Sequence, residues 1–229
     1  MATAPATMQR VSWTRPKYLV FAFVALMIAY VLRHNESFLI NRADPEWAHI
    51  QTFRWWLLPH GLAGACAILL GPMQFSDRLR QRYAKLHRVV GRIYVFGALI
   101  AAPLGAYIQY FEERMKGPRS FTMLAVVDAV LLMSTTAIAF GFILKGKVQQ
   151  HRAWMTRSFA VALVFLEGRV VLGITNWENT RPELTEAVIW SCIAFSVFAA
   201  DVVLQWQETR RARPAVARAK LARELSPVS

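Results

Sequence analysis

The chain has few charged residues, and acidic residues are scarce among them. Charged residues make up 18% of its 229 residues and hydrophobic residues 55%, whereas typical soluble domains carry about 25% charged residues. Lys and Arg number 27 against 14 Asp and Glu. The low charge points to lipid. An excess of basic residues is typical of proteins that bind nucleic acid, of proteins that contact an anionic membrane surface, and of membrane proteins whose loops are held in the cytoplasm. The positions of the charges decide among these.

Cysteine and the common catalytic motifs are also scarce. Cys66 and Cys192 are the two cysteines, and each lies inside an apolar stretch. This pattern predicts small packing residues and argues against a disulfide framework or a cysteine metal site. The sequence has no serine nucleophile in a turn motif, no phosphate loop and no HExxH helix. Nothing therefore indicates hydrolysis, and the sequence leaves open whether the protein is an enzyme.

Long apolar runs are abundant. A membrane-spanning helix needs about 20 mainly apolar residues, and five stretches meet this length. A shorter sixth is bounded by Lys17 and Arg33, whose side chains can snorkel outward. The predicted spans are Tyr18–Leu32, Trp55–Phe75, Val89–Phe111, Phe121–Leu144, Trp154–Ile174 and Ala187–Trp206. A cleaved signal peptide is the alternative for the first, but no small-x-small cleavage site is evident before His34, so we expect a retained helix.

The positions of the basic residues predict the orientation. The N-terminal tail, residues 76–92, residues 145–157 and the C-terminal tail together hold 19 of the 27, and the opposite loops hold seven. By the positive-inside rule both termini are cytoplasmic. We therefore predict an all-α integral membrane bundle with about six transmembrane helices. A cytoplasmic tail (1–17) precedes the membrane domain (18–206, core 55–175), and a basic cytoplasmic tail (207–229) follows it.

The same distribution argues against nucleic acid. The basic residues lie at helix bases, and no alternation of aromatic and basic residues suggests a platform for stacking bases. The expected partners are instead the lipid bilayer and its anionic headgroups. The C-terminal segment 208–224 is either a short helix attracted to such lipid or a solvated tail that enforces topology.

Ionisable residues inside spans are expensive and tend to mark function. His60, Asp128, Glu167 and Arg169 all fall in the predicted outer half of the membrane. Glu167 and Arg169 are two residues apart and cannot share a helix face, so at least one needs a partner on another helix. We predict that Arg169 pairs with Asp128. This charged cluster is either a structural ion pair or a proton or substrate site.

A second polar group lies at the cytoplasmic base. The third and fifth spans both run from inside to outside, and each opens with a His-Arg pair, at His87 and at His151. Parallel helices with histidines at matched depth can clamp a haem iron from both sides. The neighbouring arginines suit haem propionates or other anions, or they contact lipid phosphates and enforce topology. They are Arg88, Arg92, Arg152 and Arg157.

The second span carries a stripe of small residues before its inner end. Gly61, Gly64, Ala67 and Gly71 allow close approach of another helix or of a flat macrocycle, with helix packing the commoner use. Pro72 is expected to end or kink this helix near the inner face.

Several motifs between Leu58 and Gly173 resemble a known family. They are His60, Gly71–Phe75, Leu86–Arg88, Gly91, Arg92, Tyr94, His151, Arg152, Trp154, Met155, Arg157, Ser158 and Arg169. Together they resemble a bacterial membrane family, domain-of-unknown-function family 2306. The resemblance implies a multi-pass protein of the bacterial inner membrane and brings no assigned activity with it.

A weaker resemblance runs to the cytochrome b561 superfamily, in which histidines hold b-type haems and electrons cross the bilayer from ascorbate or a quinol. That superfamily uses four histidines in two pairs, whereas this sequence offers His60, His87 and His151 in suitable places. The resemblance therefore implies at most one haem b, on His87 and His151, with a quinol or another redox partner. Two further hypotheses stay open: a proton-coupled carrier that uses the charged cluster, and a scaffold or assembly factor without chemistry.

Overall fold

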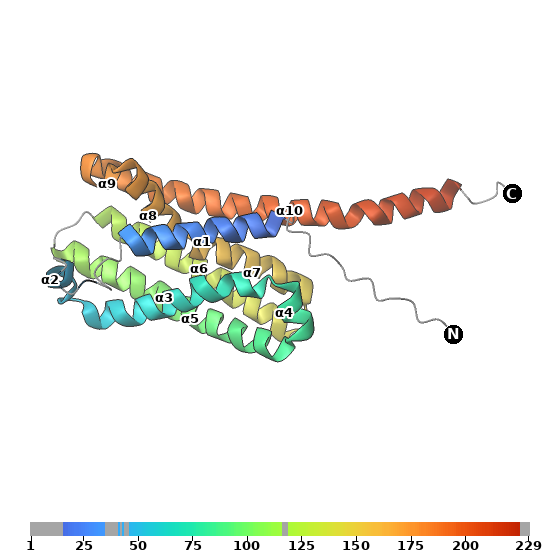
Figure 1. Cartoon of the computed structure of the whole chain (residues 1–229), viewed down its shortest axis with the longest axis horizontal. Helices are drawn as coiled ribbons and strands as arrows, with labels where there is room; N and C mark the ends of the chain where they lie inside the picture. The colour runs from blue at the N-terminus through green and yellow to red at the C-terminus, as the bar shows by residue number, and fades with distance from the viewer. Residues whose placement is uncertain (1–15, 35–40, 42, 44–45, 116–118, 225–229) are drawn as a thin grey trace.

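The computed structural model describes residues 16–34, 41, 43, 46–115 and 119–224, and these form a helical bundle (Figure 1). Its elements are α1 (Pro16–His34), α2 (Glu46–Ile50), α3 (Arg54–Gln74), α4 (Asp77–Arg82), α5 (Ala84–Met115), α6 (Arg119–Leu144), α7 (Val148–Ala162), α8 (Val164–Thr175), α9 (Trp177–Thr180), the 3-10 turn η2 (Pro182–Leu184) and α10 (Thr185–Glu224).

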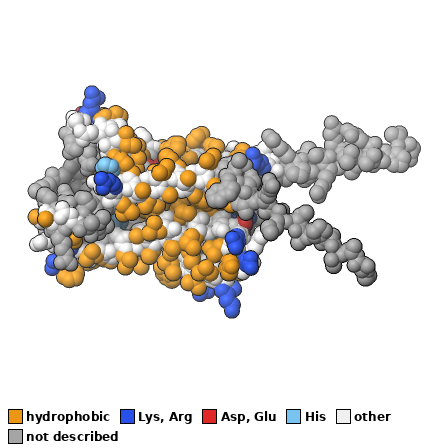
Figure 2. All heavy atoms as spheres, viewed as in Figure 1, with side chains coloured by type: hydrophobic (Ala, Val, Ile, Leu, Met, Phe, Trp, Pro, Cys, Tyr) orange, Lys and Arg blue, Asp and Glu red, His pale blue; other side chains and the backbone are white. Residues whose placement is uncertain are grey.

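The predicted spans are confirmed. Five helical stretches are long and apolar enough to cross a bilayer, and α1 contributes a shorter apolar helix. The five stretches are Arg54–Gln74, Ala84–Phe111, Ser120–Leu144, Val148–Thr175 and Thr185–Arg210. Hydrophobic side chains cover the flank of the bundle, and most of the Lys and Arg side chains in view lie towards its two ends (Figure 2). An apolar flank of this extent suits contact with lipid. This is the architecture of a helical multi-pass membrane protein.

Four helical segments form the centre of the bundle. α3 packs on α5, α5 on α6 and α6 on α7, and α7 in turn contacts α3. α5 and α7 therefore face each other across a diagonal of this ring, and α3 and α6 occupy the other diagonal. α1 packs outside it on α8, and α10 packs on α7 and α8. The beginning of α1, the exit of α10 and α4 lie at one end (Figure 1), as an even number of spans requires. We call this the inner end, following the predicted orientation.

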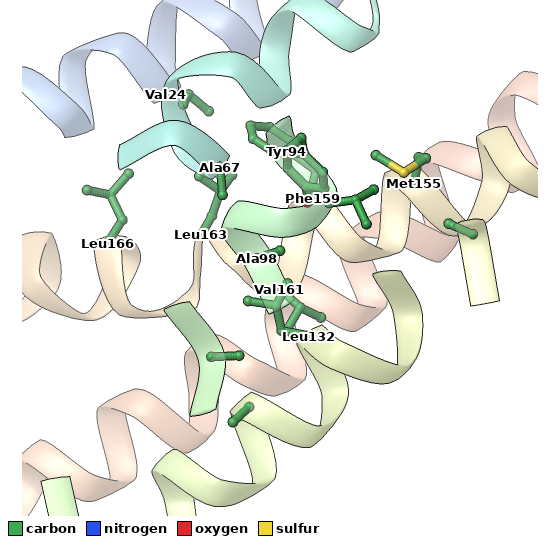
Figure 3. Packing of buried hydrophobic residues seen from close by; sticks show 14 of the residues in the cluster. Val24, Ala67, Tyr94, Ala98, Leu132, Met155, Phe159, Val161, Leu163 and Leu166 are labelled. Carbon is green, nitrogen blue, oxygen red and sulfur yellow. The ribbon is translucent and has the colours of Figure 1, made fainter. Parts of the chain in front are cut away.

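The core joins these helices through small and branched side chains. Ala67 from α3, Tyr94 from α5, Leu132 from α6 and Val161 from α7 meet in one buried cluster (Figure 3). α3 and α5 approach each other closely, since a Cβ added at Gly97 would lie 2.7 Å from the backbone oxygen of Ala63.

Most of the small-residue stripe on α3 serves helix packing, although a Cβ at Gly61 would meet nothing within 4 Å. Gly64 approaches Ala101 of α5, and the space beside Gly71 is filled by the ring of Phe159 from α7. α3 contains Pro72 within its last turn and ends two residues later, at Gln74, near the inner end as predicted. Cys66 and Cys192 are both free thiols, and Cys192 packs in a second apolar cluster between α6, α8 and α10.

Three spans begin or end beyond their apolar runs. α5 starts at Ala84 and α7 at Val148, several residues before the predicted Val89 and Trp154, because the basic first turns are helical although they are not apolar. At the other end of the chain α10 continues without interruption from Thr185 to Glu224. The segment 208–224 is therefore helical, and its attraction to anionic lipid stays a prediction.

Candidate functional site

The two inner histidines occupy equivalent places. His87 is the fourth residue of α5 and His151 the fourth residue of α7. These helices run in the same direction and face each other across the ring. The two imidazoles are close enough to interact electrostatically. The structure therefore places the two histidines that the sequence singled out in one layer at the inner end.

Each of these imidazoles keeps a nitrogen available. The Nδ1–H of His151 donates to the backbone oxygen of Ala139 on α6, at 2.8 Å, which leaves Nε2 with its lone pair. A hydrogen bond of this kind commonly orients a metal-binding histidine. The Nδ1 atom of His87 is buried and has no hydrogen-bond partner. Buried polar atoms without a partner are uncommon in folded proteins and call for an explanation.

Gln74 adds a second unpartnered atom to this layer. Its carboxamide lies against Gly91, where an added Cβ would be 3.0 Å from Oε1, and its Nε2 is buried without a partner. Gly91 follows His87 by one helical turn, so Gln74 reaches α5 one turn beyond the histidine layer. The sequence shows Gln74 only as part of the family motif. Its carboxamide fits against α5 because Gly91 has no side chain.

The four arginines near the histidines lie in different surroundings. Arg157 lies six residues beyond His151, which turns it about 120° around the helix. Its Nε and Nη2 contact Oδ1 of Asp201 on α10 at 2.9 and 2.8 Å. Arg88 is exposed and donates through Nε to the Ala84 oxygen at 3.3 Å. Arg92 is exposed and Arg152 half-buried. Arg157 thus ties α7 to α10.

A layer of hydroxyl groups lies two turns beyond the histidines. Tyr94 and Ser158 follow His87 and His151 by seven residues each, so they keep the same helix faces. The Tyr94 hydroxyl lies 2.8 Å from Ser158 Oγ, and Thr136 Oγ1 of α6 lies 2.7 Å from the same atom. All three side chains are fully buried. These hydrogen bonds connect α5, α6 and α7 above the histidine layer.

The outer residues separate into three environments. The Nδ1–H of His60 donates to the backbone oxygen of Ala101 at 2.9 Å, and Arg169 lies within electrostatic range of this imidazole. Glu167 faces α10, where its Oε2 accepts a 3.0 Å hydrogen bond from Ser196.

Asp128 does not form the predicted pair with Arg169. Its side chain is buried and Oδ1 has no hydrogen-bond partner. Arg169 is exposed and lies within electrostatic range of His60 on α3, whereas Asp128 lies on α6, the opposite member of that diagonal. His34, by contrast, is exposed and stacks on Tyr30, and the side chain of His49 lies outside the described residues.

The comparisons with known proteins agree with this architecture. A family model described as "Predicted membrane protein (DUF2306)" matches residues 57–204, about two thirds of the chain. The chain belongs to this family. No curated protein and no solved structure matches it. Among the described residues no group of three or more His, Cys, Asp or Glu could hold a metal ion.

Proposed function

We propose that this protein binds one haem b at its inner end and carries electrons within the membrane. The observation that supports it is the pair of imidazoles, His87 and His151, at the same position of two helices that face each other across the bundle. Cofactor sites in helical bundles are built from such facing helices. A haem b held by two histidines supplies reversible one-electron chemistry.

The donor atoms fit such a group. His151 is held by the Ala139 carbonyl so that Nε2 remains free, and the buried Nδ1 of His87 lacks a partner. Gln74 Nε2 is a further donor beside this layer and would serve an acceptor on the bound group. Of the four predicted arginines, Arg157 is engaged by Asp201, whereas Arg88 and Arg92 are exposed. A quinol in the bilayer is the proposed electron donor, because a membrane-embedded site is open to lipid-soluble reductants.

Haem titration of the purified apoprotein in detergent tests this proposal. We expect one haem per chain for the unmodified protein and loss of binding in His87→Ala and in His151→Ala. His60→Ala is the matched control, since His60 lies at the other end of the bundle and packs on Ala101; it should bind haem as the unmodified protein does. If both inner variants change thermal stability but not haem binding, the histidines are structural and the scaffold hypothesis is favoured.

A second candidate function, a proton-coupled carrier, is favoured by the surroundings of Asp128. A buried carboxylate without a hydrogen bond to Oδ1 inside a membrane span is expensive and tends to be retained for a task. Proton flux into proteoliposomes tests it. Asp128→Asn should abolish the flux and Ser191→Ala, an exposed hydroxyl bonded to its own helix, should preserve it. Equal flux in protein-free liposomes would refute this candidate.

A further inference from the structure

The fifth span is a discontinuous helix. The N–H of Leu163 bonds to the oxygen of Ala160, and the next regular bond runs from the Glu167 N–H to the Leu163 oxygen. α7 therefore ends at Ala162 and α8 begins at Val164. Sharp interruptions usually have a proline, a glycine or an inserted group at the break. The residues from Ala160 to Leu166 include neither proline nor glycine.

The interruption exposes backbone groups near the middle of the membrane. Leu163 is the sixteenth residue of the 28-residue span Val148–Thr175. A continuous helix would bond the amides of residues 165 and 166 to the carbonyls of Val161 and Ala162, and these bonds are absent. An N–H at the C-cap of α7 reaches the Val161 oxygen instead. Water is scarce at this depth, so such groups persist where they face protein or a ligand.

Asp128 lies on α6 between two leucines that pack on either side of this interruption. It lies one turn from Leu132 and one turn from Leu124, on the same helix face. Leu132 belongs to the buried cluster that contains Val161, and Leu124 to the cluster that contains Val164. The carboxylate thus lies between the contacts on either side of Leu163. Asp128 is 6% exposed and its Oδ1 is buried without a partner.

These groups together have the chemistry of a cation site. A carboxylate without a partner in a membrane is costly, and the carbonyl end of a half-helix carries negative partial charge. A carbonyl oxygen that accepts one N–H, as that of Val161 does, keeps a second lone pair for a cation. Interrupted helices near the bilayer midplane use such carbonyls to hold small cations. We propose that Asp128 of α6 and the carbonyls of Val161 and Ala162 at the α7–α8 interruption bind one sodium ion. Glu167 does not share this site, because it is hydrogen-bonded to Ser196 of α10.

The test measures sodium binding on the purified full-length protein in detergent. The melting temperature is recorded in rising NaCl, with choline chloride replacing it at constant ionic strength, and bound radioactive sodium is counted at equilibrium. We expect a saturating rise in melting temperature with sodium and about one bound ion per chain, because a ligand that binds the folded state stabilises it. Asp128→Asn should fold but lose both signals, and Glu167→Gln should keep them.

The outcomes separate this site from the proposed functions. Equal melting curves in sodium and choline, a full sodium response in Asp128→Asn, or a response to pH alone would each overturn the site. The haem proposal does not depend on it. The carrier proposal is also distinct: bound sodium without any ion flux in proteoliposomes would retain the site and refute the carrier.

Discussion

Ser158→Ala should destabilise the protein by removing both hydrogen bonds of the hydroxyl layer at once. Ser158 Oγ contacts the hydroxyls of Tyr94 and Thr136 at 2.8 and 2.7 Å, and all three residues are fully buried. A buried polar group left without its partner costs about 1–3 kcal/mol. Interhelical hydrogen bonds in membranes average about 0.6 kcal/mol and reach about 1.7 kcal/mol. For two such bonds we expect a loss of about 1–3 kcal/mol in the free energy of unfolding.

Tyr94→Phe gives the sharper test because its effect should depend on Ser158. In the unmodified protein it removes one bond and should cost about 1 kcal/mol. In the Ser158→Ala background the tyrosine hydroxyl has already lost this partner, so its removal should cost nothing or increase stability. Reversible unfolding in mixed micelles, followed by circular dichroism, measures all four proteins. A cost of Tyr94→Phe that is equal in both backgrounds, within about 0.3 kcal/mol, would refute the proposed network. Ser191→Ala is the matched control: this exposed hydroxyl bonds only to its own helix and should leave stability unchanged.

Three other predictions concern helix contacts and the histidine layer. Gly97→Val should lower the free energy of unfolding by about 1–3 kcal/mol through overpacking, because the added Cβ would lie 2.7 Å from the backbone oxygen of Ala63. Gly141→Ala is the control: its added Cβ meets nothing within 4 Å, so it should be neutral or stabilising. Unfolding in micelles compares the two variants. Asp201→Asn should lower the free energy of unfolding by less than about 1 kcal/mol, because the ion pair between Asp201 and Arg157 is partly exposed. If the same substitution lowers it equally in a protein whose Arg157 is already replaced, the two side chains do not interact. Gln74→Leu should weaken haem binding several-fold in the titration and leave the fold intact by circular dichroism; unchanged affinity would show that its amide does not contact the bound group.

The spans could be predicted from the sequence because lipid imposes length and hydropathy on each of them. The first residues of the spans were harder to predict. His87 and His151 were expected at the very opening of their helices, yet each lies one turn inside, because basic first turns carry no hydropathy signal. The matched histidines themselves were visible, since two parallel spans repeat the same His-Arg pair.

Other parts of the site depend on three-dimensional packing. Asp128 and Arg169 do not pair as predicted, because a charge inside a span shows its need for a partner but not the rotation of its helix. The interruption at Leu163 has no sequence signal, as neither proline nor glycine occurs there. The role of Gln74 likewise depends on the approach of α3 to Gly91.

The reduced-minus-oxidised optical spectrum of the protein, purified from cells that make ample haem, tests the central proposal most directly. The diagonal pair of His87 and His151 predicts the sharp bands of a haem b with two histidine ligands, and these bands should disappear in His151→Ala. A spectrum without haem absorbance before and after reduction, from correctly folded protein, would contradict the proposal.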